Sequence, residues 1–174
     1  MNENNNIFVA EKYAEWTSSL EVNDIPEEVK NKLQIVVMDS LGLMASAKNE
    51  PYVQSLIEAL QENGNCSLIG HNKKQTPFNA TIINGTAVHG EDFDDTFEGT
   101  PVHVGAVMVP AMLATIQEKK LSGVEFLKGL AIGSELICRL ALVAPTAVHR
   151  QGFHPTAIFG AFGSSVGISS IIGN

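Results

Sequence analysis

The sequence is short of basic residues. Its 174 residues include 11 lysines and arginines against 19 aspartates and glutamates, which gives a formal net charge of −8. Proteins that bind nucleic acid need a basic face, so this balance argues against a nucleic-acid partner. It also leaves few cations for an anionic substrate.

Cysteine is scarce as well. Cys66 and Cys138 are the only two, they are far apart, and they belong to no CxxC or Cys/His array. The sequence therefore suggests neither a disulfide framework nor a zinc site. The first residues contain no basic stretch followed by an apolar one, so we expect no signal peptide and a cytoplasmic protein.

Two segments, 127–148 and 156–172, are apolar enough to raise the question of a membrane span. The first contains Glu135 and Arg139, and the second is rich in glycine and serine. The overall content of 44% hydrophobic and 17% charged residues is that of a globular protein. We interpret both segments as buried helices of a soluble protein with no membrane partner.

Apolar residues at helical spacing predict an all-α array over a single domain, residues 1–174. Capping side chains predict helix starts at Asp24, Thr76 and Ser122, and Gly64 is the expected end of another helix. Residues 66–69 are predicted to be extended but too isolated to build a sheet. The predicted helices cover residues 7–20, 24–47, 51–63, 76–90, 104–119, 122–144 and 155–173, and the predicted loops cover 91–103 and 147–153.

The loop at 91–98 carries five carboxylates in eight residues, with His89 and His103 on either side. Its composition alone is typical of a solvated acidic loop. Residues 94–98 loosely match the DDxxD motif of Mg²⁺-dependent all-α prenyl-diphosphate synthases, but the second acidic motif and the basic residues of those enzymes are missing. A metal site of His89, Asp92 and His103 would have no recognised ligand spacing, so we predict no metal.

Two histidines stand directly before predicted helices. His103 precedes the helix at 104, and His154 precedes Pro155, which favours the first helical position. Free backbone N–H groups and the positive end of a helix dipole favour a carboxylate ligand, and the same dipole disfavours a charged imidazolium. Both rings are therefore expected to be neutral and usable as bases or hydrogen-bond donors.

Several longer motifs agree with one family. Residues 84–96, NGTAVHGEDFDDT, followed by His103 and the Val-Pro-Ala step at 109–111, closely resemble the signature of the MmgE/PrpD family. Residues 152–156, GFHPT, with the Phe-Gly step at 159–160, resemble that family's next conserved block, and residues 67–70 and 76–80 fit its upstream segment. The family includes 2-methylcitrate dehydratase and cis-aconitate decarboxylase.

The resemblance implies a helical domain interrupted by a smaller α/β lid, and homodimers that act on small polycarboxylates without a metal or organic cofactor. It implies that residues 1–174 are the N-terminal part of the helical domain, without the lid. Carried over to this sequence, the implied catalytic residues are His103, His154 and Asp92, and the implied substrate-binding residues are Thr96, Asp95 and His89. We expect His103 to be the proton donor, and His154 to be a neutral base or a hydrogen-bonding group.

Family members continue beyond the point that corresponds to Asn174, and their later residues supply the lid and active-site lysines. We therefore expect this chain to be part of a 2-methylcitrate dehydratase-like lyase, inactive alone and completed by a C-terminal fragment or further subunits. The alternative from the same residues is a non-catalytic helical remnant or dimerisation module. The prenyl-diphosphate synthase-like enzyme is a third hypothesis.

Overall fold

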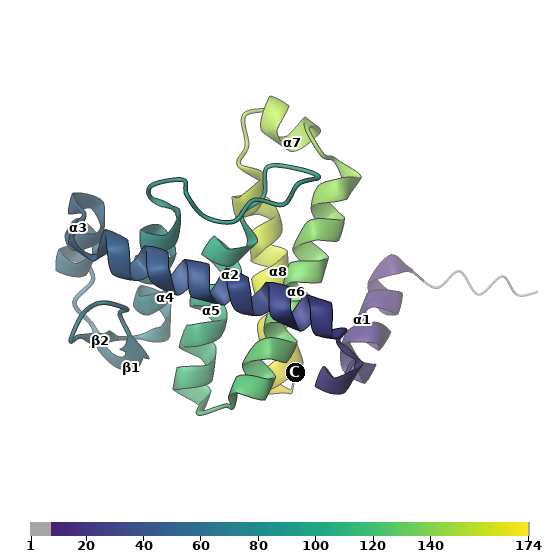
Figure 1. Ribbon diagram of the computed structural model, residues 1–174, viewed down its shortest axis with the longest axis horizontal. Helices are drawn as coiled ribbons and strands as arrows, with labels where there is room; N and C mark the ends of the chain where they lie inside the picture. The colour runs from purple at the N-terminus through teal and green to yellow at the C-terminus, as the bar shows by residue number, and fades with distance from the viewer. Residues whose placement is uncertain (1–7, 174) are drawn as a thin grey trace, which may run out of the picture.

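The computed structural model describes residues 8–173 and is mostly helical, which confirms the predicted fold class (Figure 1). Helices α4, α5, α6 and α8 run alternately up and down beside one another, and α2 crosses them (Figure 1). The helices are α1 (Val9–Ser19), α2 (Glu27–Ser46), α3 (Pro51–Ala59), α4 (Pro77–His89), α5 (Val104–Lys119), α6 (Gly123–Val143), α7 (Ala147–Arg150) and α8 (Pro155–Ile172), with 3-10 turns η1 (Val22–Asp24) and η2 (Ala47–Asn49).

Helix α5 lies at the centre of the bundle. It packs against α2, α4, α6 and α8, and this explains why its sequence is apolar on all sides. Met108, Val109 and Met112 are completely buried there and belong to one hydrophobic core with Ile83 of α4 and Ile137 of α6. Because α4 runs up and α5 runs down, the end of α4 and the start of α5 meet at one end of the bundle.

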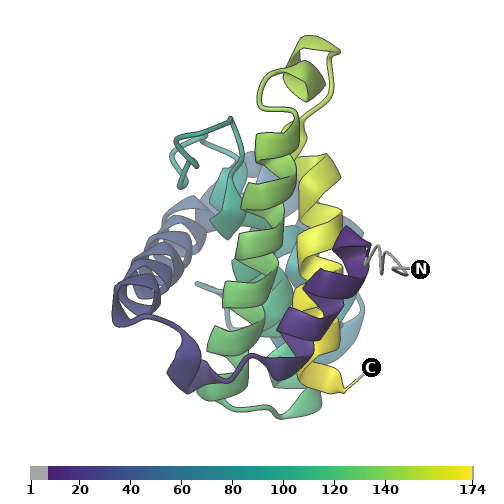
Figure 2. The ribbon, with the colours of Figure 1, turned by 90° about the vertical axis from the view of Figure 1, so that its right-hand side faces the viewer.

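Helices α6 and α8 form an antiparallel pair that touches backbone to backbone (Figure 2). A Cβ added at Gly163 would lie 2.7 Å from the carbonyl oxygen of Gly133, and one at Gly167 would lie 2.6 Å from that of Gly129. Both helices therefore use the same Gly-x-x-x-Gly spacing to approach closely. The short helix α7 closes the pair at its upper end (Figure 2), which brings the start of α8 back to the start of α5.

Local signals located most helices correctly. Thr76 caps α4, with its hydroxyl accepting a hydrogen bond from Asn79 N, and Ser122 caps α6 in the expected box with Glu125. The start predicted at Asp24 is wrong by three residues. Asp24 belongs to η1, where its carboxylate accepts from Glu21 N at 3.0 Å, and α2 begins at Glu27. The loop predicted at 147–153 contains the single-turn helix α7.

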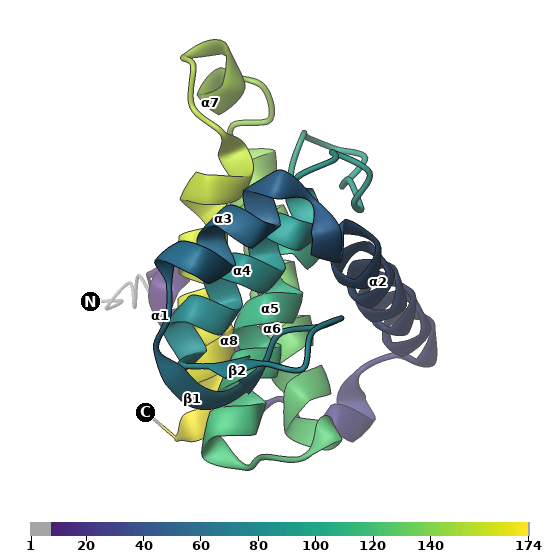
Figure 3. The same cartoon turned by 90° about the vertical axis from the view of Figure 1, so that its left-hand side faces the viewer.

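The prediction that residues 66–69 build no sheet is wrong. Strands β1 (Asn63–Ser67) and β2 (Lys74–Gln75) pair in a small antiparallel hairpin (Figure 3). The buried Asn84 of α4 holds it, because its side chain donates to Ser67 O and accepts from Ile69 N. Gly64 does not end a helix. It lies in β1, where a Cβ would collide with the backbone of Gln75.

Replacing Gly163 by alanine tests the contact between α6 and α8. The added Cβ would lie 2.3 Å from Ile137 Cγ1 and 2.7 Å from Gly133 O, so we expect Gly163→Ala to lower the free energy of unfolding by about 1–3 kcal/mol. Gly42→Ala in α2 is the matched control, because nothing lies within 4 Å of its added Cβ. At Gly42, the higher helix propensity of alanine predicts a gain of up to about 1 kcal/mol in the free energy of unfolding. Urea unfolding of both variants checks this, and equal effects at the two positions would contradict the close approach.

Candidate active site

The candidate site lies where three helix ends meet. His89 is the last residue of α4, His103 is the N-cap of α5, and His154 is the N-cap of α8. Their rings form one group, with centroids 4.7 Å apart for His89 and His103, 5.3 Å for His89 and His154, and 6.1 Å for His103 and His154. Residues 65 positions apart in the sequence thus become neighbours.

The loop between α4 and α5 is anchored at several points. Thr100 donates its hydroxyl hydrogen bond to Pro145 O, just beyond α6, at 2.9 Å. Asp95 accepts a hydrogen bond from Gly105 N at 2.8 Å and so fixes the first turn of α5. Asp92 has φ 56°, a left-handed conformation that aspartate tolerates better than most residues. These contacts set which carboxylates of the acidic loop face the histidines.

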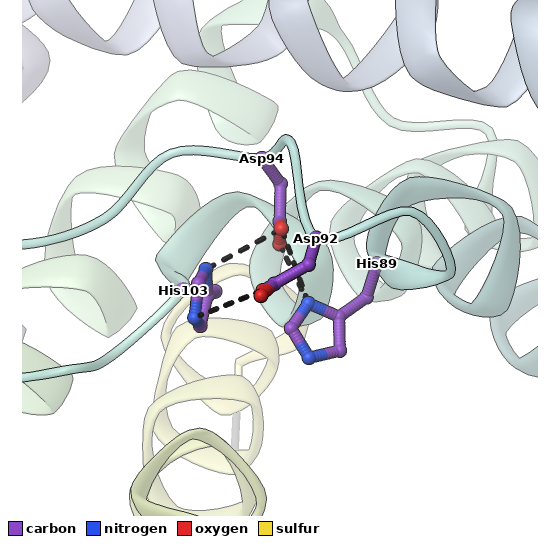
Figure 4. Close-up of side chains that lie close together, drawn as sticks. All are labelled: His89, Asp92, Asp94 and His103. Atoms are coloured by element: carbon purple, nitrogen blue, oxygen red, sulfur yellow. Dashed lines mark hydrogen bonds and ion pairs between the residues drawn. The ribbon is translucent and has the colours of Figure 1, made fainter.

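Asp94 is the carboxylate at the centre of the site (Figure 4). Its side chain is completely buried. His89 Nδ1 lies 3.1 and 3.0 Å from its two oxygens, and His103 Nδ1 lies 3.3 Å from Oδ1. Burying a carboxylate is costly unless donors or opposite charges surround it; here His89 Nδ1 is hydrogen-bonded to Asp94, and His103 Nδ1 lies within ion-pair distance.

His154 completes the group from the other side of the bundle end. Its Nδ1 accepts a hydrogen bond from Thr156 N at 3.2 Å, which confirms the predicted N-cap. Its Nε2 lies 3.2 Å from Nε2 of His89. Thr156 also accepts, through Oγ1, the backbone N–H of His103 at 3.0 Å. The buried Thr156 therefore joins the starts of α5 and α8.

The remaining predicted residues occupy different positions around His103. Thr96 Oγ1 lies 3.5 Å from His103 Nδ1, and Asp92 Oδ1 lies 3.8 Å from His103 Nε2, with the Asp92 side chain 79% exposed. Asp95 faces α2 instead, and lines a separate groove with Val36 and Asp39. The structure thus brings five of the six predicted site residues together in one cluster and places Asp95 behind it.

Two hollows flank this cluster and share His154. One, of about 340 Å³, is lined by the end of α4 and the starts of α5 and α8, including Thr86, His89 and Thr156. The other, of about 400 Å³, is lined by Asp92, His103, His149 and the segment before α8. Among the described residues that line the two hollows there is no lysine or arginine. The site offers histidines and carboxylates to a ligand, but no permanent cation.

The cluster also contains side chains of the kinds that bind metal ions. Donor atoms of His89, Asp92, Asp94 and His103 all lie within 4.8 Å of one another. Asp94, however, already has a hydrogen-bond partner in His89 Nδ1, and His103 Nδ1 lies 3.3 Å from it. The four side chains are thus held together by hydrogen-bond and ion-pair contacts among themselves.

The surroundings shift two pKa values. His154 is an exposed residue, but its ring packs against His89 and His103, and burial lowers its pKa below the ordinary 6.5. The neighbouring His89 and His103 lower it further, since a second positive charge would repel theirs. Burial also raises the pKa of the Asp95 carboxyl. The hydrogen bond from Gly105 N acts in the opposite direction and lowers this pKa, but its effect is smaller.

Comparison with known proteins identifies the family. Residues 11–174 match the MmgE/PrpD N-terminal domain. The chain belongs to the MmgE/PrpD family. Similar proteins include a cis-aconitate decarboxylase-like protein of Aspergillus oryzae, 27% identical, and the cis-aconitate decarboxylases of Aspergillus terreus and Mus musculus, 22% and 28% identical. Each match covers 95% of this chain and 36% of the relative, so the chain spans little more than a third of the length of these relatives.

Within this MmgE/PrpD domain, sequence reasoning missed the central residue. The family motif contains Asp94 but leaves open whether this residue fixes the loop or takes part in catalysis, and it does not indicate that the Asp94 carboxylate is the buried one. The positions of Thr156 and His149 in the site could not be predicted from the sequence either, because they depend on how α7 and α8 return to the bundle.

The lowered pKa of His154 predicts how stability depends on pH. The unfolded chain binds a proton at His154 more readily than the folded chain, so the stability contribution is full above pH 6.5 and is lost as pH falls from 6.5 to the folded pKa. His154→Asn keeps an N-cap acceptor for Thr156 N but removes the titrating ring. We expect this variant to be less stable than the wild type at pH 7.5, because the contact with His89 is lost, but to lose less stability between pH 7.5 and pH 5.5. Thermal melts at both pH values check this, and a steeper loss in the variant would contradict it.

Proposed function

We propose that this chain forms the histidine-bearing part of the active site of a lyase that acts on small polycarboxylates, without a metal or organic cofactor. The observation that carries the proposal is the cluster of His89, His103 and His154 around buried Asp94, open to two hollows at the starts of α5 and α8. Helix N-termini attract carboxylates, and imidazoles can bind them or exchange protons with them.

The names of the relatives favour one reaction within that class. All three relatives described above are cis-aconitate decarboxylases or proteins named for their likeness to them. We therefore propose decarboxylation of a small unsaturated tricarboxylate as the first reaction to test. Dehydration of 2-methylcitrate is the alternative that the same assay distinguishes.

The charge of the site suggests that further residues are needed to bind an anionic substrate. A tricarboxylate beside Asp92 and Asp94 needs compensating cations, and the described lining of the two hollows supplies none. We propose that these cations come from a further part of the polypeptide or from a partner subunit. On this proposal the 174 residues alone bind substrate weakly and turn it over too slowly to measure.

Substitution of single histidines tests the proposed function. The longest polypeptide that the gene encodes should convert cis-aconitate with loss of CO₂, and His103→Ala or His154→Ala should reduce kcat by about 10²–10⁴-fold. His71→Gln is the control, because His71 lies in the turn of the β1–β2 hairpin, outside both hollows. Activity should survive EDTA. Full activity in both alanine variants would refute the proposed function, whereas turnover by the 174-residue chain alone would refute the proposal that the compensating cations come from elsewhere.

The apolar character of helix α8 raises two questions: whether the protein assembles with a partner, and where in the cell it lies. Within residues 8–173 it is the one helix long and apolar enough to cross a membrane by length and composition, with a mean hydropathy of 1.4. Its inner stripe of small residues packs on α6 and α5, as in the core of a soluble protein, whereas Phe162 on the outside is 57% exposed. We propose a cytoplasmic protein in which a second copy or a complementing C-terminal fragment covers this outer face.

Solution studies test that assembly. We expect the isolated chain to self-associate in sedimentation velocity, because the outer face of α8 is apolar, and we expect Phe162→Glu to shift it toward the monomer. Phe78→Glu on α4 is the matched control, since Phe78 is also exposed, at 70%, but lies away from α8. A wild-type chain that sediments as one monomeric species and melts cooperatively would contradict the expectation.

A further inference from the structure

The hydrogen bonds of the histidine cluster determine where its protons lie. Asp94 can only accept when it is ionised, so the His89 Nδ1 atom that faces both of its oxygens is the nitrogen that carries hydrogen. In a neutral imidazole the other nitrogen then keeps a lone pair. His89 Nε2 is therefore an acceptor.

The hydrogen bond that His154 accepts indicates where the proton of its own ring lies. His154 Nδ1 accepts from the backbone N–H of Thr156, so it keeps its lone pair and the neutral ring carries its hydrogen on Nε2. That Nε2 lies 3.2 Å from the Nε2 of His89, which needs a donor. One proton fits between the two rings, and all donors point one way, from Thr156 through His154 and His89 to Asp94.

From this one-way chain we propose that Asp94 and His89 are positioning residues that hold His154 as a neutral Nε2–H donor. His154 then meets an anionic substrate as a hydrogen-bond donor, exchanging its bond to His89 for a bond to a substrate oxygen. A neutral imidazole fixed at a helix N-terminus can stabilise developing negative charge without giving up its proton. On this proposal His154 is not the base that the sequence left open.

Proton exchange with the substrate then belongs to His103. Its Nδ1 faces Asp94 and Thr96, and its Nε2 makes no hydrogen bond within the described part of the chain, because the Asp92 contact of 3.8 Å is too long. In the proposed decarboxylation, the bond to the departing CO₂ breaks and its electron pair stays on the substrate, which then takes the Nε2 proton of protonated His103. Asp94, 3.3 Å from His103 Nδ1, stabilises the imidazolium before this transfer, and the ring regains its proton from water. This division of roles rests on the proposed function, but the proton positions do not.

Ring-nitrogen NMR of the substrate-free chain, labelled with ¹⁵N, tests the proton positions. At a pH where the rings are neutral, we expect the protonated-nitrogen shift at Nδ1 of His89 and at Nε2 of His154. Asp94→Asn can donate from its amide to His89 Nδ1, so we expect the His89 proton to move toward Nε2 and the contact with His154 to break. Asp95→Asn is the matched control from the same loop, which should leave both rings unchanged.

The outcomes separate this inference from the lyase proposal. A wild-type His154 protonated at Nδ1, a His89 protonated at Nε2, or an Asp94→Asn variant with unchanged rings would overturn it, whatever the activity. The wild-type spectrum decides even where the Asp94→Asn protein does not fold. In an active enzyme, Asp94→Asn should lower kcat and alter its pH profile with little change in KM, whereas an inactive protein with the expected proton positions would refute only the proposed function.

Discussion

A carboxylate buried without lysine or arginine beside it governs how this end of the bundle is built. Asp94 is fully enclosed, and the contacts that compensate its charge come from His89 at the end of α4 and His103 at the start of α5. An uncompensated buried charge would cost several kcal/mol, so the two rings cannot be placed independently of the loop that carries Asp94. Through His89 the same constraint reaches His154 on α8. The three helix ends are thus joined by one polar cluster rather than by apolar packing alone.

The position of α8 depends on a second constraint, which is the absence of side chains. Gly163 and Gly167 let α8 touch the backbone of α6, and Gly160 lies against Val107 of α5, where a Cβ would come within 2.8 Å. This close approach brings the N-terminus of α8 beside that of α5, so that Thr156 can accept from His103 N. Small residues in the body of the bundle therefore determine the distance between two histidines at its end.

Much of this architecture follows from local sequence. Capping patterns such as Thr76 before Pro77 located the helices, because they satisfy backbone groups within one turn. The hairpin escaped prediction, since its strands are held by Asn84 from another helix rather than by their own pattern. The family motif identified the histidines, yet it could not rank the acidic residues. Which carboxylate faces inward depends on the left-handed turn at Asp92 and on the bond from Gly105 to Asp95, and neither can be read from residue order.

The central claim is that the histidines around Asp94 form a single carboxylate-binding site. A crystal structure of the longest polypeptide that the gene encodes, with cis-aconitate or its saturated analogue, tests this most directly. The account predicts the ligand in the hollows beside His154, with a carboxylate oxygen within about 3.2 Å of His154 Nε2 and His89 still bound to Asp94. A ligand seated elsewhere, such as the groove between α2 and the acidic loop, or Asp94 turned away from both rings, would contradict it.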